Sequence, residues 1–174
     1  EQILNRGLEV WKPIIAAVNG YCLAGGMTLL LSTDLRVAVE HAKFGVSEVK
    51  RGILPGNGGT QRTIQQLPYP VAMWLLLSGE WLTAQEALQY GLINKIVPEG
   101  ELIAEAERMA SIICNNGPLA VRAIKELAVR GQYMPIEYGL RLEQAMGQLL
   151  RSTEDGREGP RAFAEKRKAN FVGR

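Results

Sequence analysis

Apolar residues recur along the first part of the chain in patterns that predict short strands and helices. Residues 12–20, "KPIIAAVNG", form an apolar run that begins after a proline and ends at Asn-Gly, which is typical of a buried strand. The next apolar run, 27–34, predicts a short helix that begins just after Gly25 and Gly26. Residues 35–40, "LRVAVE", alternate apolar and polar side chains, which predicts a half-buried strand.

Glycine and proline interrupt residues 44–59 so often that this stretch is expected to be mostly loop. After it, helical spacing dominates. Helices are predicted at 60–67, 70–79, 83–91, 101–116, 118–131, 135–153 and 157–168, with a short strand at 92–98. Thr83 and Glu86 form a capping-box pattern. Gly79 and Gly91 are placed to end their helices.

The predicted strands and the later helices separate along the chain. Residues 1–98 carry three strands and the glycine-rich loop, whereas residues 99–174 are almost entirely helical. We therefore expect an α/β core over 1–98 and a helical region over 99–174. A buried strand needs neighbours on both edges, and three strands are few for that purpose. The missing strands would come from another copy or from the rest of a longer polypeptide, and the second explanation is preferred.

The composition is that of a globular protein. The chain has 174 residues, with 47% hydrophobic and 22% charged residues, enough for one domain of ordinary size. Its apolar runs are too short to span a bilayer, and residues 1–12 lack the pattern of a signal peptide, so no membrane association is expected. Cys22 and Cys114 are expected to be small core residues without a disulfide, which favours a cytoplasmic or organelle-matrix location.

Several kinds of chemistry have no support in the sequence. His41 is the only histidine and has polar neighbours, so it is expected at the surface and not in a nucleophilic triad. No His, Cys and Asp cluster has metal-ligand spacing, so no metal is expected. Residues 157–174 carry six basic and two acidic side chains, which could attract phosphate groups or form a solvated helix face. Only Phe163 and Phe171 accompany these charges, so nucleic acid is not expected as a partner.

Gly25 and Gly26 admit two interpretations. The first N–H groups of a helix lack partners, and glycine lets a ligand oxygen approach them without a Cβ in the way. Such N–H groups can stabilise a developing oxyanion. Close packing of a helix against a strand also requires glycine, and from this stretch alone packing is the simpler explanation.

Glu48 has the most unusual surroundings of the carboxylates. It lies between Val46 and Val49 in an apolar, glycine-rich stretch, where a partly buried carboxyl would be suited to proton transfer. The alternative is an ordinary solvated surface group. The "GNGGT" run that follows is not a Walker A loop, because no Lys-Ser/Thr pair follows at the required spacing.

In their order and spacing, these segments resemble the crotonase family, also called the enoyl-CoA hydratase/isomerase superfamily. The matching segments are "KPIIAAVNGYCLAGGMTLLLSTDLRVAVEHAKFGVSEVKRGILPGNGGTQR", "LSGEWLTAQEALQYGLINKIVPEGEL" and "FAEKRKANF", so the resemblance covers essentially the whole chain. It implies a spiral of ββα units followed by helices that form homotrimers, often paired into hexamers. It also implies an acyl-CoA thioester as substrate, without a separate cofactor, whose carbonyl oxygen is bound by two backbone N–H groups while an enolate-like state forms.

The resemblance assigns roles to individual residues. Gly25 corresponds to one oxyanion donor, whereas the second donor belongs to a segment several dozen residues before the first strand. Ala24 and Gly26 flank Gly25 in the substrate site, and alanine at the first position of the family's glycine triplet is expected to be a mild change. Gly56 and Asn57 fall where the family lines the acyl pocket.

Near the C-terminus, Phe163 and Lys166 correspond to an aromatic residue and a lysine that contact the CoA adenine and phosphates.

Hydratases of the family use two glutamates; the second corresponds to Glu48, but the first corresponds to Thr28, which cannot act as a general base. A single carboxylate resembles the family's isomerases, whereas "GILPGNGGTQR" resembles its hydratases. Hydration of a 2-enoyl-CoA with Glu48 as acid and base is the leading hypothesis. The alternatives are a single-carboxylate double-bond isomerase and a catalytically silent CoA-binding member.

Overall fold

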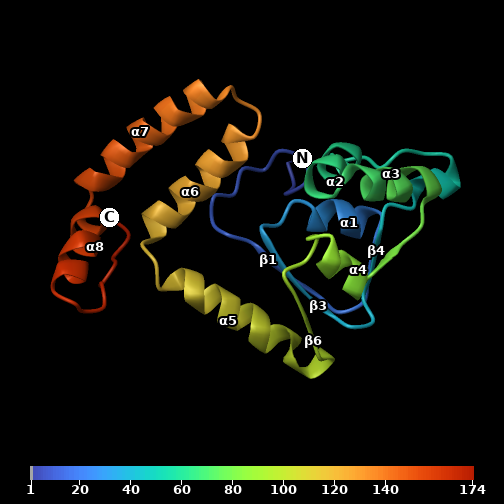
Figure 1. Ribbon diagram of the computed structural model, residues 1–174, viewed down its shortest axis with the longest axis horizontal. Coiled ribbons are helices and arrows are strands. Elements are labelled where there is room, and N and C mark those ends of the chain that lie inside the picture. The colour runs from blue at the N-terminus through green and yellow to red at the C-terminus, as the bar shows by residue number, and fades with distance from the viewer. Residues whose placement is uncertain (1) are drawn as a thin grey trace. The chain divides into compact units, whose positions relative to one another are not determined.

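The computed structural model describes residues 2–174 (Figure 1). The described chain divides into two compact units, one formed by residues 2–10 and 14–109 and the other by residues 11–13 and 110–174. No helix in the described part is both long enough and apolar enough to cross a membrane. The assignment of functional domains to 1–98 and 99–174 stays a prediction.

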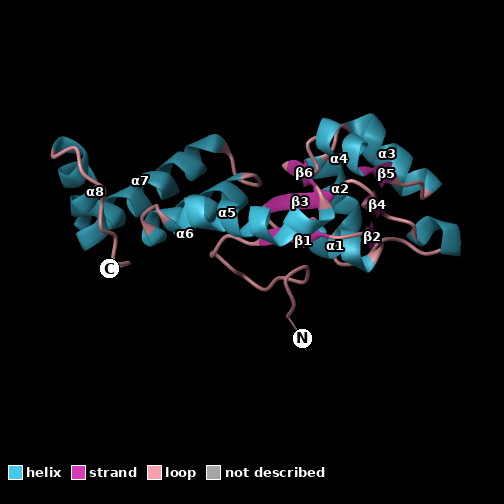
Figure 2. Ribbon diagram, turned by 90° about the horizontal axis from the view of Figure 1, so that it is seen from below, coloured by secondary structure: helices cyan, strands magenta, loops and turns pink. Residues whose placement is uncertain are grey.

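The first unit contains all the described strands, which Figure 2 shows in magenta. They are β1 (Ile15–Val18), β2 (Tyr21–Leu23), β3 (Leu35–Val39), β4 (Lys43–Gly45), β5 (Leu82–Thr83) and β6 (Lys95–Val97). The helices that accompany them are α1 (Gly25–Leu30), η1 (Glu48–Arg51), α2 (Gly59–Gln66), α3 (Tyr69–Ser78), α4 (Ala84–Gln89) and η2 (Glu99–Glu101), of which η1 and η2 are single 3₁₀ turns. The helix α5 (Leu102–Cys114) begins in this unit.

The strands form two sheets, and each ββα repeat contributes one strand to each sheet. The first sheet has the order β1-β3-β6 and is parallel throughout. The second has the order β2-β4-β5, with β2 parallel to β4 and β5 antiparallel to it. The chain thus runs β1, β2, α1 and then β3, β4, η1 before the helices α2 and α3. This repetition confirms the expected α/β architecture of ββα units.

The three predicted strands form the first sheet, whereas the three strands of the second sheet were not predicted. The interpretation of 35–40 as half-buried was wrong, because β3 lies between two parallel neighbours and its last four residues are all buried. Arg36, the charged residue in that pattern, is 7% exposed. Its guanidinium donates to the carbonyl oxygens of Leu92 and Thr33, at 3.0 Å each, and to Oε1 of Gln66 at 2.7 Å.

The core of the first unit packs α1 against the two sheets and the helices that follow. The largest fully buried side chains include Met27, Val37, Phe44 and Leu75, which come from α1, β3, β4 and α3. The helix α1 begins at Gly25, two residues before the start at residue 27 that the sequence predicted. The start of α1 is therefore fixed by the buried side chains of Met27 and Thr28 in the same helix.

The second unit is helical and includes the end of α5 with α6 (Pro118–Gly131), α7 (Ile136–Ser152) and α8 (Glu154–Ala164). The helix α7 packs against both α6 and α8 (Figure 1). Residues 11–13 join this unit through α6. The Arg130 guanidinium lies 5.1 Å from the centre of the Trp11 ring, and Lys125 Nζ donates to the Lys12 carbonyl at 2.9 Å.

Candidate functional site

The parallel pairing of β2 and β4 brings two of the predicted site residues to one sheet edge. Leu23 of β2 lies opposite Gly45 of β4, and the Ala24 N–H donates to the Gly45 carbonyl at 2.9 Å. From this pair of strand ends, one chain continues into Gly25 and the other into Glu48. Because carboxyl ends of parallel strands share an edge, the chain leaves the same edge of the sheet toward α1 after Leu23 and toward η1 after Gly45.

The glycines at the start of α1 are open to a ligand. Gly25 and Gly26 are exposed, and a Cβ added at either would meet no atom within 4 Å. Packing therefore does not explain them, in contrast to Gly59, where a Cβ would lie 2.8 Å from side-chain atoms of Pro55 and Thr28. As the first residue of its helix, Gly25 has an N–H group without a partner inside that helix.

Ala24 holds the turn into α1 in a backbone conformation that glycine favours. Its φ is 49° and its ψ is −118°. A residue that has a Cβ rarely adopts a positive φ, so the backbone of Ala24 is strained directly before α1. Alanine is thus a larger change for the backbone than the sequence alone indicates, although the helix still begins at the next residue.

Glu48, the first residue of η1, carries a buried oxygen that nothing in the described chain satisfies. The side chain is half-buried, and its Oε2 atom has no hydrogen-bond partner among the described residues. A buried carboxylate oxygen without a partner is costly, and such groups in folded proteins usually have a reason outside their own packing. The oxygen remains available to accept a proton or a hydrogen bond from a ligand.

Thr28 is buried and its hydroxyl is already engaged. The residue is 2% exposed. Its Oγ1 donates to the Gly25 carbonyl at 3.0 Å and accepts from Asn5 Nδ2 at 3.1 Å. Asn5, also buried, keeps its own Oδ1 without a partner in the described chain. Sequence reasoning missed Asn5, since no motif connects it to a residue 23 positions away.

Asn57 is tied to the same N-terminal segment. It adopts a positive φ of 54°, which asparagine tolerates better than most residues, and its Oδ1 accepts a hydrogen bond from Arg6 Nε. Its carbonyl accepts from Arg62 Nη1 at 2.8 Å, and the same nitrogen donates to the Asn5 carbonyl at 3.3 Å. Gly56 beside it is exposed, with open space where a Cβ would lie.

Comparison with known proteins identifies the family. The family profile described as "Enoyl-CoA hydratase/isomerase" matches residues 2–174. The chain belongs to this family. It is 45% identical over 166 residues to the (E)-benzylidenesuccinyl-CoA hydratase of Thauera aromatica, covering 95% of this chain and 65% of that protein. It is 44% identical to the crotonyl-CoA hydratase of Syntrophomonas wolfei, covering 92% of this chain and 62% of that protein.

A solved structure confirms the crotonase fold of this family member. The enoyl-CoA hydratase from Bacillus anthracis superposes with a TM-score of 0.93 at 37% sequence identity. The match covers 98% of this chain and 66% of that structure's chain. In these comparisons the crotonase-family chain thus spans slightly less than two thirds of the length of its relatives.

The two predicted CoA contacts of this crotonase-family chain lie in the second unit, whereas the other predicted site residues lie in the first. Phe163 is 86% exposed and Lys166 is exposed. Lys166 has a φ of 54° and donates its N–H to the Phe163 carbonyl at 3.1 Å, while Arg167 N–H donates to the Ala162 carbonyl at 3.0 Å. This is the Schellman arrangement that ends a helix, and glycine is the usual residue at the position of Lys166.

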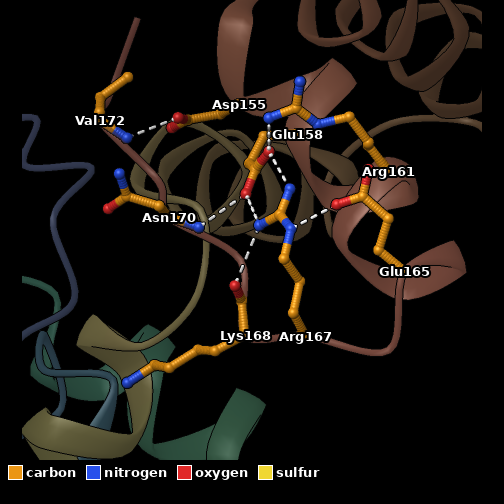
Figure 3. A network of polar contacts seen from close by, with 8 residues as sticks. All are labelled: Asp155, Glu158, Arg161, Glu165, Arg167, Lys168, Asn170 and Val172. Carbon is orange, nitrogen blue, oxygen red and sulfur yellow. Dashed lines mark hydrogen bonds and ion pairs between the residues drawn. The ribbon is translucent and has the colours of Figure 1, made fainter.

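The basic C-terminal segment is partly neutralised by Glu158 (Figure 3). Glu158 accepts from Arg167 Nη2 at 2.9 Å, from the Asn170 N–H at 2.9 Å and from Arg161 Nη2 at 3.0 Å. The Arg167 guanidinium, followed by the Asn170 N–H, lowers the pKa of Glu158 to about 2. These two arginines are therefore paired in place, whereas the Lys166 side chain makes no hydrogen bond or ion pair within residues 2–174.

The remaining candidate groups take no part in this site. Both cysteines are free; Cys22 is buried as predicted, but Cys114 is exposed, which corrects the expectation of two core cysteines. Burial raises the pKa of the Cys22 thiol to about 11, so it is a protonated core residue at neutral pH. His41 is exposed, as predicted. Within the described residues, no group of three or more His, Cys, Asp and Glu side chains is arranged to hold a metal ion.

Proposed function

We propose that this crotonase-family chain carries the catalytic groups of an acyl-CoA thioester enzyme that hydrates a 2-enoyl-CoA. In this proposal the Gly25 N–H binds the thioester carbonyl oxygen and stabilises the enolate-like state. Glu48 takes a proton from water as the water oxygen bonds to C3, and it returns a proton to C2. The similarity to relatives named as hydratases of CoA thioesters supports the hydration reaction.

The unpartnered Oε2 of Glu48 is the observation that carries the proposal. A carboxylate in a half-buried position would normally be held by an arginine, a lysine or backbone N–H groups. Glu48 has no such partner for this atom; it follows β4 by three residues, and the open glycines of α1 follow β2, the strand paired with β4. A proton acceptor beside an exposed N–H donor is the arrangement that enolate chemistry requires.

Double-bond isomerisation is the second candidate, and Thr28 favours it. A hydratase gains from a second group that orients the water, but the Thr28 hydroxyl donates to the Gly25 carbonyl, and Thr28 as a residue is 2% exposed. With Glu48 alone, the same site could remove a proton from C2 of a 3-enoyl-CoA and return it to C4. A silent CoA-binding member is the third candidate.

The proposal extends to CoA contacts in the second unit. Phe163 exposes its ring, which suits stacking on adenine, and Lys166 presents an unpaired ammonium, which suits a phosphate. Lys166 adopts a positive φ at a position where glycine is the usual residue, and a contact of its side chain with a CoA phosphate would explain why a lysine is there. A homotrimeric or hexameric assembly and a cytoplasmic location stay predictions.

Glu48→Gln tests the proposal. We expect kcat for crotonyl-CoA hydration to fall by about 100-fold or more in the complete polypeptide, because the amide cannot accept the proton. Glu40→Gln is the matched control, since Glu40 is an exposed carboxylate directly after β3 and its replacement should leave the rate unchanged. Full turnover by Glu48→Gln would refute the proposed role of Glu48.

Parallel assays separate the three candidates. Wild-type hydration of crotonyl-CoA supports the hydratase, whereas a shift of the double bond in 3-enoyl-CoA without hydration supports the isomerase. In the second case Thr28→Glu, which supplies a second carboxylate, is expected to gain hydration. CoA binding without either reaction would support the silent member.

A further inference from the structure

The position of Glu48 is set by its neighbours along the chain. Its Oε2 has no partner in the described residues, so that atom does not anchor the side chain. The residues on either side of Glu48 are Ser47, which precedes η1, and Val49 and Lys50, which follow within η1. Whatever holds these flanking residues therefore holds the carboxylate.

On the first side, Trp81 holds Ser47. The indole Nε1 donates to Ser47 Oγ at 2.7 Å, and Ser47 Oγ in turn donates to the Gly79 carbonyl at 3.3 Å. These bonds connect residues that lie 34 and 32 positions apart in the chain. The hydroxyl immediately before Glu48 is thus fixed from two directions.

The Trp81 ring also lies directly on the end of β4. A Cβ added at Gly45 would be 2.7 Å from Trp81 Cδ1 and 3.2 Å from the Glu80 carbonyl oxygen. Only glycine leaves room for the ring there, because a real Cβ essentially never approaches an atom so closely. The Trp81 ring also packs in a T-shaped arrangement with the Tyr21 ring, with the two ring centres 5.8 Å apart.

On the second side, the residues before Trp81 hold Val49 and Lys50. Lys50 Nζ pairs with Glu80 Oε1 at 2.8 Å. A Cβ at Gly79 would lie 2.9 Å from Lys50 Cγ and 3.1 Å from Val49 Cγ1, and this glycine adopts a φ of 68°. Residues 79–81, here named the 79–81 clamp, therefore contact the chain immediately before and immediately after Glu48.

We propose that Trp81 is a positioning residue for Glu48 and acts through Ser47. The inference rests on the proposed role of Glu48 as the group that moves the proton. Proton transfer depends steeply on placement, so loosening the Ser47 anchor should lower kcat while KM changes little. A residue that merely stabilised the fold would lower the unfolding midpoint and leave kcat of the folded enzyme unchanged.

Trp81→Phe keeps a ring on Gly45 and removes the N–H donor, and Ser47→Ala removes the acceptor. In the complete polypeptide, both are expected to lower kcat about tenfold. Ser47→Thr keeps the hydroxyl and should restore most of the rate. Trp74→Phe is the matched control, because Trp74 is an exposed tryptophan on α3 and should leave kcat unchanged.

The rate of amide hydrogen exchange in the peptide covering residues 46–52 measures how firmly the 79–81 clamp holds this segment, independently of activity. Faster exchange in Trp81→Phe with a lower kcat, and no further loss of rate when Trp81→Phe is combined with Glu48→Gln, supports the inference. Unchanged exchange, or faster exchange with an unchanged kcat, overturns it. If Glu48→Gln alone is fully active, the role of Glu48 fails, and the exchange measurement still decides whether Trp81 holds the segment.

Discussion

Ala24 shows how one methyl group changes the balance at the entrance to the site. With a φ of 49° and a ψ of −118°, its backbone adopts a conformation that only glycine adopts without strain. The Gly25 N–H follows directly, so the strain lies next to the proposed oxyanion donor. Removing the Cβ relieves the strain in the folded state, and this gain exceeds the extra freedom that glycine adds to the unfolded chain.

Ala24→Gly is therefore expected to raise the free energy of unfolding by about 1 kcal/mol. Urea denaturation checks this through a higher midpoint with an unchanged slope. Ala104→Gly is the control, because Ala104 is exposed within α5, where glycine should instead destabilise by about 1 kcal/mol. Equal losses at both positions would show that Ala24 is not strained.

For single residues, the sequence identifies unusual side chains better than it identifies the side chains that they contact. Glu48 could be singled out because a carboxylate between valines in a glycine-rich stretch is unusual. The contacts of Ser47 with Trp81 and of Thr28 with Asn5 could not, because they join residues 34 and 23 positions apart without any local pattern. Tertiary pairing of single side chains leaves no trace in hydrophobic spacing.

Most of the elements that the sequence predicted are long enough to show a pattern; the exception is β6 (Lys95–Val97), a three-residue strand within the predicted range 92–98. The four-residue β1, the five-residue β3 and the helices from α2 onward have recognisable patterns. The strands β2, β4 and β5 have three, three and two residues, too few for a period of two to be seen. The chain passes from β1 to β2 and from β3 to β4, so the pairing of β1 with β3 brings β2 beside β4, and β5 then pairs with β4. The topology and not the local sequence thus creates the second sheet.

Arg36 is the residue that joins these elements. From the buried strand β3, its guanidinium satisfies two carbonyls, those of Thr33 and Leu92, and the side chain of Gln66 in α2. Burial lowers the pKa of this guanidinium, yet the hydrogen bonds account for a charged residue inside the core. The alternating pattern predicted that Arg36 faces solvent, and this was wrong because the side chain is buried and hydrogen-bonded inside the first unit.

Arg36→Met is expected to destabilise the first unit by about 3 kcal/mol, because the three acceptors lose their donors inside the fold. Arg36→Lys keeps the charge but cannot reach several acceptors with a planar fork, so an intermediate loss is expected. Thermal and urea unfolding of the two variants measure the difference. A methionine variant as stable as wild type would mean that water replaces the lost donors.

In each unit of the molecule, one glutamate joins segments that local sequence does not connect. In the first unit, Glu105 of α5 accepts from Arg108 Nη2 at 2.7 Å and pairs with Lys95 of β6 at 3.0 Å. In the second, Glu158 of α8 holds Arg167 and the Asn170 N–H of the C-terminal segment (Figure 3). The Arg108 side chain, followed by Lys95, lowers the pKa of Glu105 to about 2.

Both carboxyls therefore have folded-state pKa values of about 2, below the ordinary value of 4.5. A depressed carboxyl pKa gives stability that is present above the unfolded-state pKa and is lost as pH falls through the folded-state pKa. We expect the free energy of unfolding to decline between pH 4.5 and about 2, with each glutamate contributing up to one proton to the slope.

Glu105→Gln and Glu158→Gln should each make the decline shallower, whereas Glu101→Gln, at an exposed carboxyl of η2, should not. Urea unfolding at a series of pH values measures the slopes, and an undiminished slope in both variants would assign the acid sensitivity to other carboxyls.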